Sequence, residues 1–229
     1  MLGVLVNALA VVLGGGIGLL CKKGIPKRLT DAVMIGIGLC TLYIGIDGAL
    51  EGENILIVIA AMVLGAIVGT LLDIDAAINR LGTWVEKTFH AEGGKNSLAE
   101  GFVTASLLFC VGSMTIVGSL NAGISGDNEM LFTKSTLDFV AAAMLSASLG
   151  AGVLLSAAFV LVFQGSIVLL SSLIAPILTA AAIAEMTCAG SLLIMALGFN
   201  FIGITKIKVA NYMPAVFFAP VLAWVVSLV

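Results

Sequence analysis

The chain is made largely of long apolar segments, and this feature leaves few folds open to it. Eight segments of about 20 residues are almost free of charge, which is the length an α-helix needs to cross a bilayer. They cover residues 1–21, 29–50, 54–73, 97–120, 134–152, 153–175, 180–204 and 209–228. Only 10% of the 229 residues are charged, whereas soluble domains carry about 25%. The sequence therefore predicts an all-α membrane protein with about eight transmembrane helices.

The stretch 134–175 is about twice as long as one span, so its division decides the count. It contains "LGAGV", and glycines are the usual breaking points of an apolar run. We expect the chain to turn at Gly150–Gly152. The segments then form a single transmembrane domain over 1–229, divided into a first repeat (1–73), an amphipathic helix (74–91), central spans (97–152) and a second repeat (153–229).

The basic residues predict the orientation, because cytoplasmic loops are enriched in lysine and arginine. With eight spans, nine of the ten basic residues fall on one side, in the connections 22–28, 74–96 and 205–208, and only Lys134 falls on the other. Acidic residues occupy the opposite loops, 47–53 and 127–129. We therefore expect both termini outside the cytoplasmic membrane.

Residues 74–91 have a different pattern from the spans. Apolar residues recur at spacings of three and four, at Ile74, Ile78, Leu81, Val85 and Phe89, and charged residues lie between them. This pattern is typical of an amphipathic helix. We expect the helix to lie on the inner leaflet of the membrane.

The two ends of the chain resemble each other. When the sequence is shifted by 150, residues 3–26 face 153–176 with eight identities in 24 positions, namely Leu5, Ala8, Val12, Gly15, Ile17, Leu19, Leu20 and Pro26 and their partners. The second block lies five spans after the first, and because each span reverses the direction of the chain, this odd number gives the two blocks opposite orientations. The sequence thus predicts an inverted repeat, with spans one to three related to spans six to eight, an arrangement found in secondary transporters.

Glycines stand at matching positions in this repeat. Gly14, Gly15 and Gly16 in "LGGGIG" correspond in depth to "FQGS", which contains Gln164 and Gly165. One interpretation is a pair of interrupted helices that line a cavity. The other is close helix packing, because Gly14 and Gly18 form a G-x-x-x-G motif.

Several polar residues within the spans are candidates for a substrate or ion pathway. Lys134 and Asp138 are four residues apart and suit an ion pair, although a solvated anchor at the outer edge fits equally well. Glu185 is the best single acidic candidate for binding a cation or a proton, and a solvated glutamate is the alternative. The full candidate set is Gly14, Gly15, Gly16, Ser113, Thr115, Asp138, Gln164, Gly165, Glu185 and Asn200. We expect Gly15 and Gly165 to flank a site that Gln164, Ser113, Thr115 and Asp138 complete.

Other classes of function receive no support from the sequence. The net charge of −3 argues against nucleic acid as a partner. The single histidine and the four scattered cysteines have no metal-ligand spacing. No nucleophile with a base and no phosphate-binding loop is present. We therefore expect no enzyme activity, no cofactor and no bound metal.

Long stretches of the chain also resemble a known family. "LVNALAVVLGGGIGLL", "LGAIVGTLLDID" and "EGFVTASLLFCVGSMTIVGSL" are similar to the YqgA/YdfK-like bacterial inner-membrane family, a domain of unknown function. The resemblance covers the whole chain and implies a location in the bacterial inner membrane. It implies no site residues.

The sequence thus favours a small multi-pass transporter or channel for a small ion or solute, and a monovalent cation or a small neutral solute would suit the polar residues. The alternative is a non-transporting scaffold or regulatory protein of the membrane. Membrane lipids and the small ion or solute are the expected partners, and a homo-oligomer stays open.

Overall fold

The computed structural model describes residues 1–22, 27–78, 80, 95–111 and 113–227, which form helices and short connections without any strand. The predicted all-α class is confirmed. The elements are α1 (Leu2–Lys22), α2 (Lys27–Ala49), α3 (Ile55–Leu71), α5 (Lys95–Cys110), α6 (Ser113–Ile124), α7 (Glu129–Leu149), α8 (Gly152–Leu169), α9 (Ser171–Ile174), α10 (Ala180–Phe201), the 3₁₀ turn η1 (Val209–Tyr212) and α11 (Pro214–Val226).

Within this described part, five helical segments are long and apolar enough to cross a membrane. They are 2–21, 129–149, 152–169, 180–201 and 209–226. Two further apolar helices, 34–49 and 55–71, are shorter. The chain is therefore a helical protein with several membrane-spanning segments.

The predicted span 97–120 is not one straight helix. Its two parts, Leu98–Cys110 and Met114–Ile124, meet at an angle of 60°, and they make a sixth candidate span only if they are counted together. The hydroxyl group of Thr115 donates a hydrogen bond across the break to the carbonyl oxygen of Phe109, at 2.9 Å. Length and hydropathy, on which the predicted span rests, do not reveal where the backbone hydrogen bonds of a span are interrupted.

Local signals account for several helix boundaries. Asn54 and Thr179 accept hydrogen bonds from the backbone N–H groups of Leu56 and Ala182, and thus cap the starts of α3 and α10. α7 and α8 are separated by Gly150, whose φ of 84° is a conformation that glycine adopts without strain. The predicted turn at Gly150–Gly152 is confirmed.

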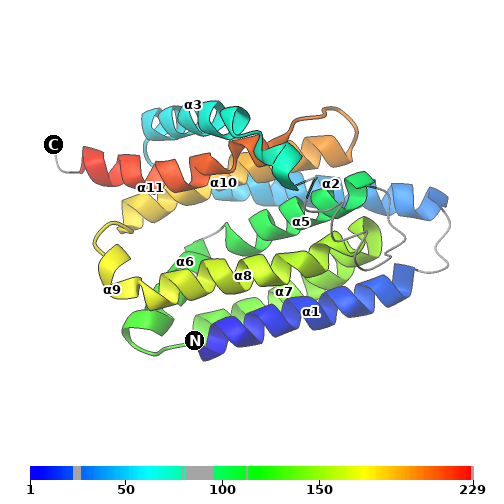
Figure 1. Cartoon of the computed structure of the whole chain (residues 1–229), viewed down its shortest axis with the longest axis horizontal. Coiled ribbons are helices and arrows are strands. Elements are labelled where there is room, and N and C mark those ends of the chain that lie inside the picture. Colours follow the sequence, from blue (N-terminus) through cyan, green and yellow to red (C-terminus); the bar gives the residue numbers. More distant parts are fainter. Residues whose placement is uncertain (23–26, 79, 81–94, 112, 228–229) are drawn as a thin grey trace.

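The helices form two groups that face each other (Figure 1). α1, α7 and α8 lie in one group with α6, and α2, α3, α10 and α11 lie in the other. α5 contacts helices of both groups, α8 in the first and α10 in the second. A continuous apolar core joins the groups and includes Phe109, Ile116, Leu145 and Leu193.

The glycines of α1 bring this helix against the backbone of α7. A Cβ atom at Gly14 would overlap the carbonyl oxygen of Phe139, and one at Gly18 would overlap that of Ala143. The two helices run parallel, since higher residue numbers in α1 meet higher numbers in α7. α1 continues as an unbroken helix through all these positions. The G-x-x-x-G packing interpretation is therefore correct for Gly14, and the interrupted helix is not observed.

Candidate functional site

A buried ion pair lies between α1 and α7. The ammonium group of Lys134 donates to Oδ1 of Asp138 at 2.8 Å, and the side-chain amide of Asn7 donates to Oδ2 of the same carboxylate at 3.0 Å. Lys134 is only 7% exposed and Asp138 only 5%. The predicted pairing is present in the structure, and the interpretation of these residues as a solvated anchor is wrong.

An apolar cluster next to this pair gives a common level from which positions along four helices can be compared. The cluster consists of Val4 from α1, Ala122 from α6, Leu131 from α7 and Val168 from α8. The four residues come from the same end of the helix bundle, since α6 and α7 are joined by a short turn and α8 runs antiparallel to α7. One helical turn deeper is a step of three or four residues, or about 5.4 Å.

That step reaches a polar residue on each of the four helices. It leads from Val4 to Asn7, from Ala122 to Ser119, from Leu131 to Lys134, and from Val168 to Gln164. Asp138 lies one turn further along the same face of α7 as Lys134. We call the set Asn7, Ser119, Lys134, Asp138 and Gln164 the polar layer.

Several polar atoms of this layer have no hydrogen-bond partner in the part of the chain that the structure describes. They are Oδ1 of Asn7, Oγ of Ser119, and both Oε1 and Nε2 of Gln164. All three side chains are fully buried. Because buried polar groups in proteins are nearly always hydrogen-bonded, these orphaned atoms mark the layer as a place where a polar ligand or water would be stabilised.

The break between α5 and α6 lies close to the same layer. Both α5 and α6 contact α7, the helix that carries Lys134 and Asp138, and Cys110 at the end of α5 is buried. The break thus interrupts a helix near the depth of the buried charges. This resembles, in general form, the interrupted helices that accompany binding sites in transporters.

The structure does not bring the two predicted glycine positions together. A Cβ atom at Gly15 would contact Leu154, near the start of α8, whereas one at Gly165 would contact only Met1. α1 and α8 are therefore antiparallel, and the two glycines lie at opposite ends of their interface. The expectation that Gly15 and Gly165 flank one site is wrong, because matching positions in antiparallel helices diverge away from the crossing point. Gly16 faces open space.

The remaining candidates are distributed over the molecule. Ser113 is the first residue of α6. The hydroxyl group of Thr115 donates its hydrogen bond to Phe109 across the helix break and is not directed at a ligand. Glu185 is 1% exposed, and its Oε1 accepts hydrogen bonds from the backbone N–H groups of Glu53 and Asn54, just before α3. The solvated interpretation of Glu185 is thus wrong, and its observed contacts fasten the α2–α3 turn to α10.

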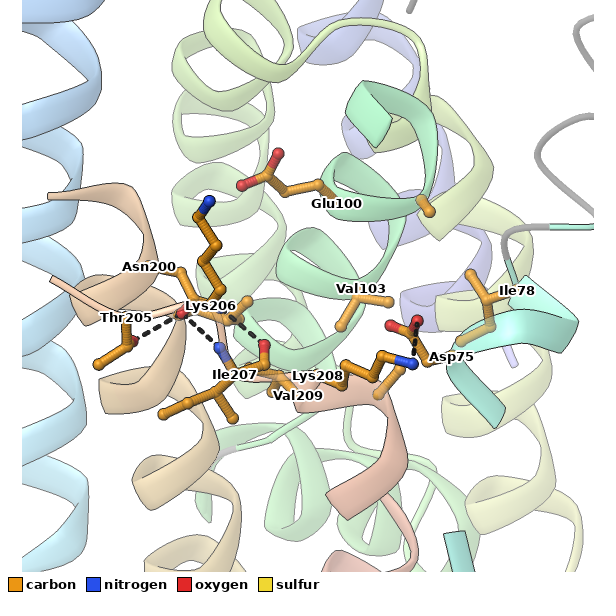
Figure 2. A pocket seen from close by; sticks show the side chains of 13 residues that line it. Asp75, Ile78, Glu100, Val103, Asn200, Thr205, Lys206, Ile207, Lys208 and Val209 are labelled. Atoms are coloured by element: carbon orange, nitrogen blue, oxygen red, sulfur yellow. Dashed lines mark hydrogen bonds and ion pairs between the residues drawn. The ribbon is translucent and has the colours of Figure 1, made fainter. Parts of the chain in front are cut away.

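Asn200 organises the connection between α10 and η1. Its Oδ1 accepts from the hydroxyl group of Thr205 and from the N–H of Ile207, and its Nδ2 donates to the carbonyl oxygen of Ile207. Figure 2 shows these bonds in the wall of a cavity of about 330 Å³. Asn200 is thus far along α10 from Glu185 and does not join the polar layer.

The cavity contains charges of both signs. Lys208 lies 4.0 Å from Asp75 at one side, and Figure 2 shows the side chain of Lys206 extending on the side of Glu100. Ile78 lines the same cavity and, with Ile74, packs against the main core. Of the amphipathic helix predicted at 74–91, residues 79 and 81–91 lie outside the described residues.

The polar layer combines one carboxylate, one ammonium group, two amides and a hydroxyl group. Its formal charge is zero when Lys134 and Asp138 are both ionised. Within the described part of the chain, no three His, Cys, Asp or Glu side chains gather as metal ligands. Of this layer, only Asp138 and Gln164 were among the site residues predicted from the sequence. Lys134 was predicted as the ion-pair partner of Asp138, and Asn7 and Ser119 were missed. The signal that finds them is the step of one turn from the apolar cluster, which only the packed helices reveal.

Fold, apolar helices and buried polar layer together define a multi-pass α-helical membrane protein. The family described as "Protein of unknown function (DUF554)" matches residues 2–224, so the chain belongs to this family. It is 30% identical over 230 residues to "Uncharacterized membrane protein YdfK" of Bacillus subtilis, covering 99% of this chain and 97% of that protein. It is 31% identical over 222 residues to "Uncharacterized protein YqgA" of Escherichia coli, covering 96% and 94%. No solved structure matches.

Proposed function

We propose that this protein is a small transporter or channel that moves a monovalent cation across the bacterial cytoplasmic membrane through the polar layer. The observation behind this proposal is the group of fully buried, unpartnered polar atoms on Asn7, Ser119 and Gln164 beside a buried carboxylate. An unsatisfied buried polar group costs about 1–3 kcal/mol. A protein that served only as a scaffold would gain stability from apolar residues at these positions.

Within this proposal, α1, α2, α3, α5 with α6, α7, α8, α10 and η1 with α11 are the eight crossings. The alternating direction of packed helices supports this count, and α1 begins and α11 ends at the same end of the bundle (Figure 1). Both termini then lie outside, because the basic connections occupy the opposite, cytoplasmic end.

The proposed inverted repeat relates α1, α2 and α3 to α8, α10 and α11. Its support is that each helix contacts its counterpart: α1 with α8, α2 with α10 and α3 with α11. The pairs are antiparallel, as Gly38 and Gly48 of α2 face Phe201 and Ser191 of α10. An axis in the membrane plane that passes through the crossing points produces this arrangement.

The test is cation flux into liposomes that contain the purified protein. Gln164→Leu removes both unpartnered polar atoms of the side-chain amide, and we expect it to abolish flux while the melting temperature stays equal or rises. Ser166→Ala is the matched control on the same helix, because Ser166 is exposed and its hydroxyl group bonds to its own helix at Val162.

Flux of sodium or potassium ions that exceeds that of empty liposomes, and that Gln164→Leu removes, supports the proposal. Wild-type protein without flux of any monovalent cation contradicts it and favours the scaffold or regulatory function. Undiminished flux in Gln164→Leu contradicts the assignment to the polar layer.

A further inference from the structure

The two oxygens of Asp138 have partners of different kinds. Oδ2 accepts from Asn7, which is fully buried and comes from another helix. Oδ1 accepts from Lys134, a long and flexible side chain one turn away on the same helix. One oxygen is thus held in place by a neutral group, while the other is occupied by a cation that the protein itself supplies.

We propose that Lys134 is an internal substitute for the transported cation, and that the ammonium group and a monovalent cation bind Asp138 in turn. This inference rests on the function proposed above. When the cation arrives, it takes the position at Oδ1, and Lys134 withdraws. Oδ1 of Asn7, Oε1 of Gln164 and Oγ of Ser119 lie unpartnered at the same level, as oxygens available to the incoming ion.

Charge balance is the reason for an exchange rather than an addition. With Lys134 in place the layer is neutral, so a second cation would leave an uncompensated buried positive charge, which is strongly unfavourable. If the cation replaces the ammonium group, neutrality is kept. The same balance selects a monovalent ion, because the layer offers one carboxylate and sites for divalent cations use several anionic oxygens.

Lys134 has a place to which it can withdraw. α7 begins at Glu129, so Lys134 lies five residues, or about 7.5 Å, from the helix start. Lysine side chains near the end of a membrane helix commonly extend to the aqueous interface. Asn7 stays hydrogen-bonded to Oδ2 and acts as a positioning residue that keeps the carboxylate in the layer.

The experiment measures cation-dependent stability of the purified full chain in detergent. The melting temperature is recorded in sodium, potassium or lithium chloride, against choline chloride at the same ionic strength. We expect Lys134→Met to melt lower than wild type in choline and to be restored by a small cation, with an apparent affinity about tenfold or more above that of wild type, a factor equal to 1.4 kcal/mol. Asp138→Asn should show no cation dependence.

Lys208→Met is the matched control, because Lys208 also pairs with an aspartate, Asp75, but is largely exposed at the rim of the cavity. It should keep the cation dependence of wild type. A second measurement needs no variant: labelling of Lys134 in wild type by a water-soluble amine reagent should be faster in the stabilising cation than in choline.

Three results would overturn the exchange. They are equal cation affinity in Lys134→Met and wild type, a stability of Asp138→Asn that depends on the cation, and a labelling rate of Lys134 that is the same in every salt. Failure of the proposed function is distinct, because it appears as absent flux in liposomes. If the protein conducts cations but Lys134 and the cation do not compete for Asp138, the exchange is refuted and the proposed function stands. If they compete but no flux is measured, the exchange holds as a binding event and transport is refuted.

Discussion

Two helix interfaces in this protein use the same packing device and differ in what they enclose. In the α1–α7 interface, Gly14 and Gly18 meet the α7 backbone, and in the α2–α10 interface Gly45 and Gly48 meet Met195 and Ser191. Among the side chains that the structure describes, only the first interface encloses a buried ion pair with an amide. Glycines thus indicate where two helices approach closely, whereas the polar side chains buried between the helices indicate a candidate functional site.

The largest expected effect comes from filling the glycine contacts of both interfaces. Gly14→Leu and Gly45→Leu should each lower stability by about 3 kcal/mol or more, because the added side chain must separate the helices. Gly16→Leu and Gly36→Leu are matched controls on the same two helices, since a Cβ atom at either position meets no neighbour within 4 Å. Melting temperatures of the four purified variants provide the measurement. Equal melting of Gly14→Leu and Gly16→Leu would disprove the packing role.

The next effect should separate the two interfaces. Asp138→Asn leaves the buried charge of Lys134 without its partner, and we expect a loss of about 3–5 kcal/mol. Replacing both residues together, as Lys134→Met with Asp138→Asn, should cost less than the single change because no charge stays buried. Thermal unfolding of both variants and of Lys134→Met forms a double-mutant cycle. A purely additive cycle would show that the ion pair has no energetic coupling.

A smaller effect is expected at Glu185, the only acidic residue described within α10. Glu185→Ala removes the acceptor of two backbone hydrogen bonds and should cost about 1–3 kcal/mol, whereas Glu185→Gln keeps an acceptor oxygen and should cost about 1 kcal/mol or less. Flux per folded molecule should be unchanged in Glu185→Gln. If this variant folds but loses flux, the second group of helices also contributes to the pathway and the comparison fails.

The smallest effect is expected for hydroxyl groups that bond to their own helix. Thr41 in α2 donates to the carbonyl oxygen of Ile37, and Ser135 in α7 donates to that of Leu131. Such bonds are local and replace no contact between helices. Thr41→Val and Ser135→Ala should therefore change stability by less than about 1 kcal/mol, measured by thermal unfolding. A larger loss in Ser135→Ala would extend the polar layer to this hydroxyl group.

Features that depend on nearby residues were predictable from the sequence. The turn at Gly150 and the pairing of Lys134 with Asp138 follow from local spacing, and both are present in the structure. The bend between α5 and α6 was not predicted, because length and hydropathy identify a span without giving the course of its axis. The bond from Asn7 to Asp138 joins residues 131 positions apart. Helical periodicity gives the face on which each residue lies but not which faces meet.

The distance along the chain between Asn7 and Asp138 also has a consequence for biosynthesis. Lys134 and Asp138 share one helix, so this pair can form as soon as α7 folds, and its charges enter the membrane already neutralised. Asn7 has no such local partner. At about 5–20 residues per second, the 131 residues up to Asp138 take roughly 7–26 s to synthesise. During that interval the side-chain amide of Asn7 lacks the carboxylate that it binds in the folded protein, so this contact can form only after α7 has been made.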